Sequence, residues 1–148
     1  MVGCASIEDL THLSCTPPTS PGDVILQREA YLYQIQGEPG VSLWDSPLRN
    51  GRWNAGQLTL DEQVPLYTLA AGTQLTITRV TRQQRSGSLP ADIIVEGTAS
   101  IDTATVVFHY NWGKDSHVNY APWESTTDNT HDLSRTVSCR PNNRNGAG

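Results

Sequence analysis

Apolar and polar side chains alternate with a period of two residues over several stretches of this chain. The alternation is clearest over 104–112, where every second residue is large and apolar. Successive side chains of a strand point to opposite faces, so this spacing predicts a half-buried strand. Its inward face would carry Val106, Phe108, Tyr110 and Trp112.

Further strands are expected on the same grounds. Tyr31, Tyr33 and Ile35 share one face, and the glycines and proline of 37–40 supply a turn before 41–44, which predicts a hairpin. Other strand candidates are 64–69, 73–81, 92–97 and 133–139. In 73–81 Leu75 and Ile77 alternate cleanly but Val80 breaks the parity, so a bulge or change of facing is expected near Arg79.

Roughly six to eight short strands separated by turn residues predict an all-β fold, a small antiparallel barrel or sandwich. Residues 6–13 carry apolar side chains at helical spacing, which predicts a short N-terminal helix. Three prolines within 16–22 predict an extended tether. The expected organisation is 1–22 as anchor and tether, 23–139 as the β domain and 140–148 as a flexible tail.

Apolar residues on the inward faces are the expected core. They are Phe108, Val106, Leu75, Ile77, Ile94 and Tyr33, joined by the rings of Trp44 and Trp112. Trp53, Tyr120 and Trp123 lie in polar, turn-rich segments and are expected to keep exposed edges. Exposed amphipathic rings anchor protein interfaces and stack on sugars, whereas the alternative is that they fill the core.

The segment Met1-Val2-Gly3-Cys4-Ala5 resembles a bacterial lipobox, in which a small residue precedes the cysteine that receives the lipid. The resemblance implies lipidation at Cys4 and attachment to a membrane. Ala5, where enterobacterial lipoproteins retained at the inner membrane usually have aspartate, implies the outer membrane, with the domain facing the periplasm. No charged and apolar leader precedes Cys4 in this sequence, so the alternative is an ordinary thiol in a cytosolic protein.

Cys15 and Cys139 fall at the two ends of the expected domain and lack the spacing of a metal site. They are expected to form a disulfide, which would leave Cys4 free for lipid. Disulfides persist in oxidising compartments, so this pairing and the lipobox resemblance support each other. Two unpaired buried thiols are the alternative.

A second resemblance is carried by Leu43-Trp44-Asp45-Ser46-Pro47 and by 69–77, in which Ala71-Gly72-Thr73 precedes a strand. These segments resemble the bacterial SH3-like module. The resemblance implies an SH3-like variant of the small β domain.

The net charge of −5 at pH 7 argues against a nucleic-acid partner, because such proteins present a basic surface. Metal binding or acid–base catalysis would need the carboxylates and histidines to converge, and their spacing fits no known ligand pattern. We expect no such convergence, no cofactor and no metal. The residues concerned are Asp102, His109, Asp115 and His117, with Asp128, His131 and Asp132 further along.

Arginines form the remaining cluster in an otherwise acidic chain. They can pair with carboxylates of a partner, or they can keep exposed strands soluble. The expected partner-binding residues are Trp53, Tyr120, Trp123, Arg49, Arg52, Arg82 and Arg85, with Arg79 in the same cluster.

These observations together predict a non-enzymatic bacterial envelope lipoprotein that binds a protein partner in the periplasm. An assembly subunit of an envelope complex and an immunity protein both fit. A glycan- or cell-wall-binding module is the first alternative, and a small metal-dependent hydrolase is the second.

Overall fold

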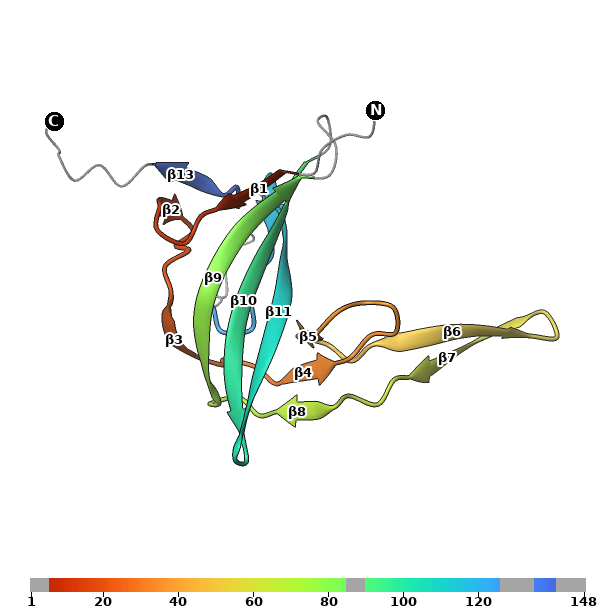
Figure 1. Cartoon of the computed structure of the whole chain (residues 1–148). Coiled ribbons are helices and arrows are strands. Elements are labelled where there is room, and N and C mark those ends of the chain that lie inside the picture. The colour runs from red at the N-terminus through yellow and green to blue at the C-terminus, as the bar shows by residue number, and fades with distance from the viewer. Residues whose placement is uncertain (1–5, 85–89, 126–134, 141–148) are drawn as a thin grey trace, which may run out of the picture.

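The computed structural model describes residues 6–84, 90–125 and 135–140. Within these ranges the regular structure consists of β-strands, which confirms the predicted all-β class (Figure 1). The strands are β1 (Ser6–Asp9), β2 (Ser14–Thr16), β3 (Gly22–Ile25), β4 (Ala30–Tyr33), β5 (Val41–Trp44), β6 (Arg49–Asn54), β7 (Gln57–Glu62), β8 (Tyr67–Leu69), β9 (Gln74–Gln84), β10 (Asp92–Ile101), β11 (Ala104–Lys114), β12 (His117–Val118) and β13 (Ser138–Arg140).

One sheet of nine strands makes up the body, in the order β1-β9-β10-β11-β5-β4-β8, with β3 also on β9 and β12 also on β11. The long strands β9, β10 and β11 form an antiparallel meander. β5 pairs with β11 in parallel, Val41 opposite Phe108, so the expectation of purely antiparallel pairing is wrong at this point. The predicted hairpin of β4 and β5 is confirmed, with Tyr31 opposite Trp44.

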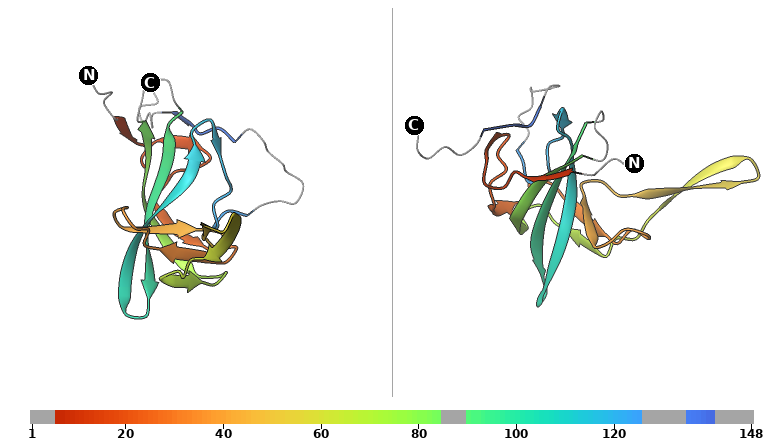
Figure 2. Two further views of the ribbon diagram at one scale, coloured as in Figure 1. Left: turned by 90° about the vertical axis from the view of Figure 1, so that its right-hand side faces the viewer. Right: turned by 45° about the horizontal axis from the view of Figure 1, so that its top comes forward.

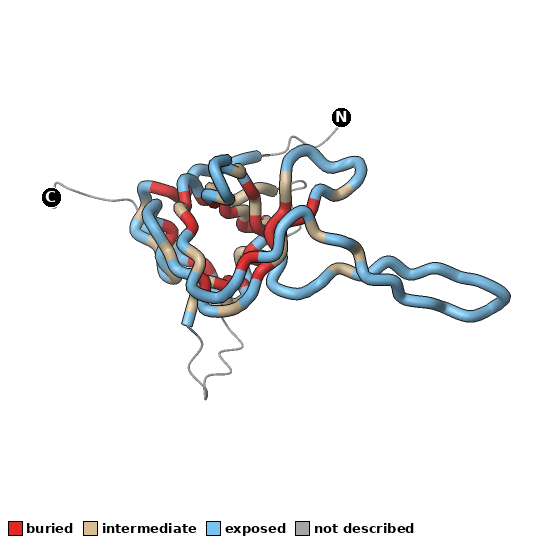
Figure 3. The backbone as a smooth tube through the Cα atoms, turned by 90° about the horizontal axis from the view of Figure 1, so that it is seen from below, coloured by how far each residue is buried: buried red, intermediate tan, exposed pale blue. Residues whose placement is uncertain are grey.

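The sheet bends where β3 leads into β4. β3 pairs with β9 and β4 pairs with β8 in one continuous register, from Gly22 opposite Ile77 to Leu32 opposite Tyr67. Backbone hydrogen bonds at Leu26 bridge the gap between the two ladders. The sheet therefore curls, and the buried residues line the inside of the curl (Figure 3).

The core lies on the concave face of this sheet, largely as the alternation predicts. Phe108, Leu75, Ile77 and Tyr33 are 5% exposed or less, which confirms their prediction as core. The predicted face of β10 is wrong, because Ile93 is fully buried and Ile94 lies on the other face. Val95 and Ala99, which share the parity of Ile93, are buried with it.

The remaining core predictions are confirmed for some residues and wrong for others. Trp112 is buried as expected, whereas Val106 is partly buried and packs at the margin of the core. Trp44 is 37% exposed, so its assignment to the core is wrong. It follows the buried Leu43 directly, and adjacent residues of a strand point to opposite faces. Only one of the two can therefore face the core.

The change of facing expected near Arg79 is confirmed. β10 pairs Glu96 with Arg79 but its next residue, Gly97, with Ile77, so one residue of β9 is unpaired there. This bulge lets Val80 return to the buried face.

The N-terminal segment is not a helix, so the prediction for 6–13 is wrong. Ser6–Asp9 forms β1, which pairs with β9 from Ser6 opposite Gln84 to Asp9 opposite Thr81. A turn follows, in which Asp9 accepts hydrogen bonds from the side chain and backbone of Thr11. These hydrogen bonds lower the pKa of the Asp9 carboxyl. Short helices are marginal in water, whereas the edge of β9 offers a full row of backbone partners.

Cys15 and Cys139 form a disulfide, as predicted, with their Cα atoms 3.9 Å apart. They lie opposite each other in the ladder of β2 and β13. The strand expected over 133–139 is therefore β13, and it pairs with β2 in a separate sheet rather than with the main one. The predicted strand over 64–69 is reduced to β8. Thr19 in the predicted tether is buried and donates its hydroxyl hydrogen bond to the carbonyl of Leu10.

Candidate interaction surface

The hairpin of β6 and β7 projects from the body as an arm (Figures 1 and 2). We define the arm as residues 49–62. It forms its own two-stranded sheet, with Arg49 opposite Glu62 at the root and Asn54 opposite Gln57 at the tip. Every residue of both strands is exposed. Six residues of extended chain reach about 20 Å, so the tip lies well clear of the body.

The local sequence explains why the arm folds back on itself. Ala55 and Gly56 connect the strands, and both have positive φ, 53° and 80°. A two-residue connection with two positive φ angles matches the right-handed twist of a hairpin. Ala55 accepts a conformation that L-residues rarely adopt, which the ladder on either side must stabilise.

The arm has one apolar and one polar face. Residues opposite each other in the ladder share a face, so Trp53 and Leu58 lie beside Gly51 and Leu60. A methyl group placed on Gly51 would lie 3.2 Å from a Leu58 methyl carbon and 3.8 Å from a Leu60 one, which shows that both leucines cover this glycine. The opposite face carries Asn50, Arg52, Asn54, Gln57, Thr59 and Asp61.

This apolar face is exposed to solvent in the described structure. Trp53 is 72% exposed, Leu58 52% and Leu60 56%. Val64, Leu66 and Tyr67, which follow the arm in sequence, are exposed as well. A lone two-stranded hairpin is marginally stable in water, and contiguous exposed apolar patches mark interaction sites. The arm therefore has the properties of a surface that a partner covers.

The root of the arm is fixed by hydrogen bonds. The Leu48 amide donates to the hydroxyl of buried Tyr33 at 3.0 Å, and the Gln63 amide donates to the Leu48 carbonyl at 2.8 Å. Across the strands, the Gln63 side chain donates to Asn50 at 2.7 Å. The core thus holds both strands where they leave the body.

The arm carries no net charge, since Arg49 and Arg52 balance Asp61 and Glu62. Arg52 approaches Asp61 at 3.5 Å, a solvent-exposed contact of little energetic weight. A neutral arm with an apolar face selects a partner by hydrophobic contact more than by charge.

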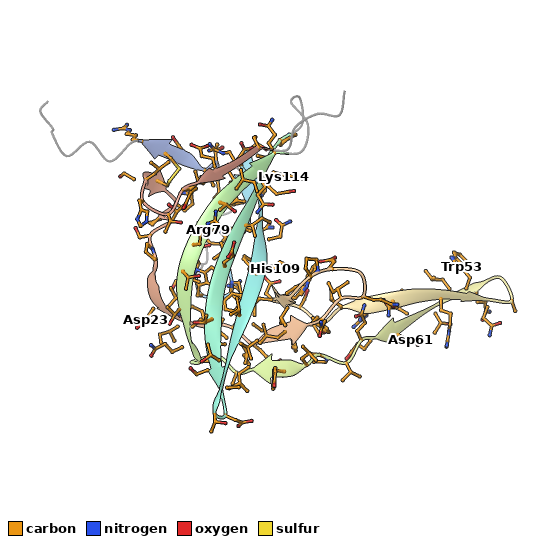
Figure 4. The ribbon with its side chains drawn as sticks, viewed as in Figure 1. Asp23, Trp53, Asp61, Arg79, His109 and Lys114 are labelled. Atoms are coloured by element: carbon orange, nitrogen blue, oxygen red, sulfur yellow. A yellow bond between two sulfur atoms is a disulfide. The ribbon has the colours of Figure 1, made fainter. Side chains whose placement is uncertain are left out.

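An open groove of about 1080 Å³ lies beside the root of the arm, on the outer face of β10, β11 and β5. Its apolar lining includes Ile94, Trp44 and Val107, which is 63% exposed. Glu38 and His109 also line it, and Figure 4 shows His109 on β11 and Trp53 near the tip of the arm. Tyr110 lines the same groove, and burial, followed by the nearby Asp45 charge, raises the pKa of its hydroxyl.

Tyr120 and Trp123 do not join Trp53 on one surface. Both are partly buried in the body, where Arg135 stacks over the Tyr120 ring at 4.0 Å and Trp123 packs edge-on against Tyr110 at 5.3 Å. Arg135 also pairs with Glu124 at 2.6 Å. The three rings therefore do not form one shared surface.

The arginines predicted to bind a partner do not lie on one surface either. Arg49 and Arg52 lie on the arm, whereas Arg82 binds Glu8 of β1 at 2.7 Å and approaches Asp115 at 3.5 Å. Arg79 lies 3.8 Å from Asp9 and 3.7 Å from Glu96. Arg79 and Arg82 therefore link strands of the body. Arg85 lies outside the described residues.

The described carboxylates and histidines considered for metal or acid–base chemistry do not gather into one cluster. Asp102 sits in the turn between β10 and β11, and Asp115 follows the other end of the eleven-residue β11. This separates them by about 30 Å or more along the strand. His109 lies between them and His117 is in β12. The described residues contain no group of three or more such side chains able to hold a metal, and Asp128, His131 and Asp132 lie outside them.

Cys4, the predicted lipidation site, also lies outside the described residues. Among those that the structure does describe, no helix has the length and apolar character needed to cross a bilayer.

Comparisons of the chain with protein-family models, with curated proteins and with solved structures found no match.

Sequence reasoning identified Trp53, Arg49 and Arg52 but missed the hairpin that joins them and the leucines beside the tryptophan. A signal was present, because Gly51 and Trp53 alternate with polar residues on one side of Ala55-Gly56 and Leu58 and Leu60 do so on the other. That pattern predicts a hairpin with one apolar face. It does not show that the face points away from the body.

Proposed function

We propose that the chain is a bacterial envelope lipoprotein without enzymatic activity, whose domain docks a protein partner through the apolar face of the arm. The observation that carries this proposal is the exposure of Trp53, Leu58 and Leu60 on a hairpin rooted firmly in the core. Evenly matched charges on the arm favour an apolar protein surface over nucleic acid or a charged glycan.

The envelope assignment rests on the lipobox resemblance at Cys4, with the outer membrane as destination and the periplasm as the side that the domain faces. Support comes from the disulfide between Cys15 and Cys139, because such bonds persist in oxidising compartments. An assembly subunit of an envelope complex and an immunity protein both require a docking surface of this kind.

We also infer that the curled sheet belongs to the small-barrel architectures that the sequence resembles, the SH3-like module among them. Support comes from the continuous register in which the β3–β4 stretch pairs with both β9 and β8. Through this pairing, the β3–β4 stretch connects the β9–β10–β11 meander to the β4–β5 hairpin.

The docking proposal predicts a difference between two adjacent positions on the arm. In Leu60→Cys the thiol is on the apolar face, and in the matched control Thr59→Cys it is on the polar face. Alkylation by a membrane-impermeant maleimide should be about tenfold slower at position 60 in outer-membrane-permeabilised cells than in dilute purified protein, since an occupied interface excludes the reagent. Position 59 should react at similar rates in both settings.

Equal rates at position 60 in cells and in dilute protein would contradict the docking proposal. Failure of the reagent to reach position 59 in permeabilised cells would contradict the periplasmic location.

A further inference from the structure

The arm and the groove beside its root have complementary properties. The arm presents Trp53 and Leu58 at its tip, and the groove presents Val107, Ile94 and Trp44. Its volume, about 1080 Å³, slightly exceeds the roughly 300–1,000 Å³ of pockets that bury organic ligands. An indole ring with the hairpin turn behind it is an occupant of suitable size and chemistry.

Charge complements this apolar match. The groove is lined by the carboxylates of Glu38, Asp45, Asp92 and Glu96. Three of them have a cation of the same chain nearby: Arg28 at Asp45, Lys114 at Asp92 and Arg79 at Glu96. Within the described residues no ion pair is found for Glu38. Arg49 lies on the same face of the arm as Trp53 and is exposed, so it is a suitable cation for Glu38.

A chain cannot place its own arm in its own groove. β5 lines the groove, and β6 begins only a few residues after β5 ends. The hydrogen bonds at Leu48 and Gln63 hold both strands of the arm at this root. The right-hand view of Figure 2 shows the arm leading away from the body. Any hairpin that enters the groove must therefore come from another molecule.

We propose that the occupant is the arm of a second copy of this chain, so that two copies exchange arms about a twofold axis. The inference rests on the proposed function of the arm as a docking surface, and it names the partner. A twofold axis repeats each contact, since the arm of either copy enters the groove of the other. The duplication matters because a stable interface buries about 800 Å² on each partner, more than the tip of one hairpin supplies.

Sedimentation of the native chain measures this directly. We expect a species of twice the 16.2 kDa chain mass at micromolar concentrations. Leu58→Gln should raise the dissociation constant of the dimer by at least about tenfold, since it places an amide in the apolar contact. Thr59→Gln introduces the same residue on the polar face and should leave the dimer unchanged. Position 58 is exposed, so thermal melting of the body should be the same in both variants.

Disulfide trapping then identifies the contact. One chain carries Trp53→Cys and another Val107→Cys, both with Cys4→Ser, so a bond between the two new thiols must join two copies. The mixture should yield the mixed disulfide, and Thr59→Cys in place of Trp53→Cys should not. A monomeric native chain at high micromolar concentration, or Trp53→Cys chains that bond to each other instead of to Val107→Cys, would overturn the arm exchange.

These outcomes separate the two proposals. A monomer whose position 60 is still protected in cells contradicts the second copy and leaves the docking function standing. A monomer whose position 60 reacts freely in cells contradicts both.

Discussion

Replacing Cys15 and Cys139 together with alanine is expected to lower the free energy of unfolding by about 2–5 kcal/mol. The bridge joins residues 124 positions apart, so its loss restores a large number of conformations to the unfolded chain. It also frees β13 from β2, and both cysteines pack at the margin of the core. Equilibrium unfolding in urea, for the double variant and the native chain, measures the difference.

The native chain in reductant is the matched control. It should lose as much stability as the double variant, and the double variant should be insensitive to reductant. Coincident unfolding curves for the oxidised native chain and the double variant would contradict the expectation.

Gly97→Ala is expected to cost about 1–3 kcal/mol or more, because the core has no room for a methyl group at this position. The new Cβ would lie 2.6 Å from the Thr76 carbonyl oxygen and 2.8 Å from the Phe108 ring. The first is backbone in the neighbouring strand, and the second belongs to a ring that is 1% exposed. Neither can move away cheaply. Thermal and urea unfolding report the loss.

Gly51→Ala provides the comparison, since Gly51 is also a strand glycine but lies on the exposed arm. Its new methyl would meet the mobile end of Leu58, and a change within about 0.5 kcal/mol is expected. Adding Phe108→Leu to Gly97→Ala should cost less than the two single changes added together, since the smaller side chain relieves one of the two clashes. Strict additivity would mean that the ring contact is not the cause.

The period-two pattern predicted the all-β class and most of the core because it reports a local property of each strand. On β9 even the parity break at Val80 predicted the bulge that the structure contains. On β10 the pattern was ambiguous, because Ile93 and Ile94 are both apolar and either could face inward. This pair alone does not decide, but Asp92 and Glu96 share the parity of Ile94, whereas the buried Val95 and Ala99 share that of Ile93.

Long-range pairing explains the other errors. Residues 6–9 form a strand because the edge of β9 lies beside them, although β9 is some seventy positions away in sequence. Likewise β5 pairs in parallel with β11, Val41 opposite Phe108, and the side-chain spacing of 41–44 does not indicate that partner. In both cases the partner strand decides the structure, and the local side-chain spacing does not.

The candidate site was predicted in part for the same reason. The exposed tryptophan at position 53 and the arginines at 49 and 52 follow from their polar, turn-rich surroundings. The separation of Trp53 from Tyr120 and Trp123 depends on where the arm leaves the body and on the contacts of Arg135. The polar surroundings that the three rings share in the sequence had predicted partner binding for all of them.

The central claim is that the apolar face of the arm is covered by protein in the assembled state. Photo-crosslinking in native membranes tests it most directly, with a photoreactive phenylalanine at position 60 and, as control, at position 59. The account predicts an adduct of discrete mass from position 60 that position 59 does not give, and a mass of two chains would identify the second copy as partner. The same adducts from both faces, or none from position 60, would contradict the account.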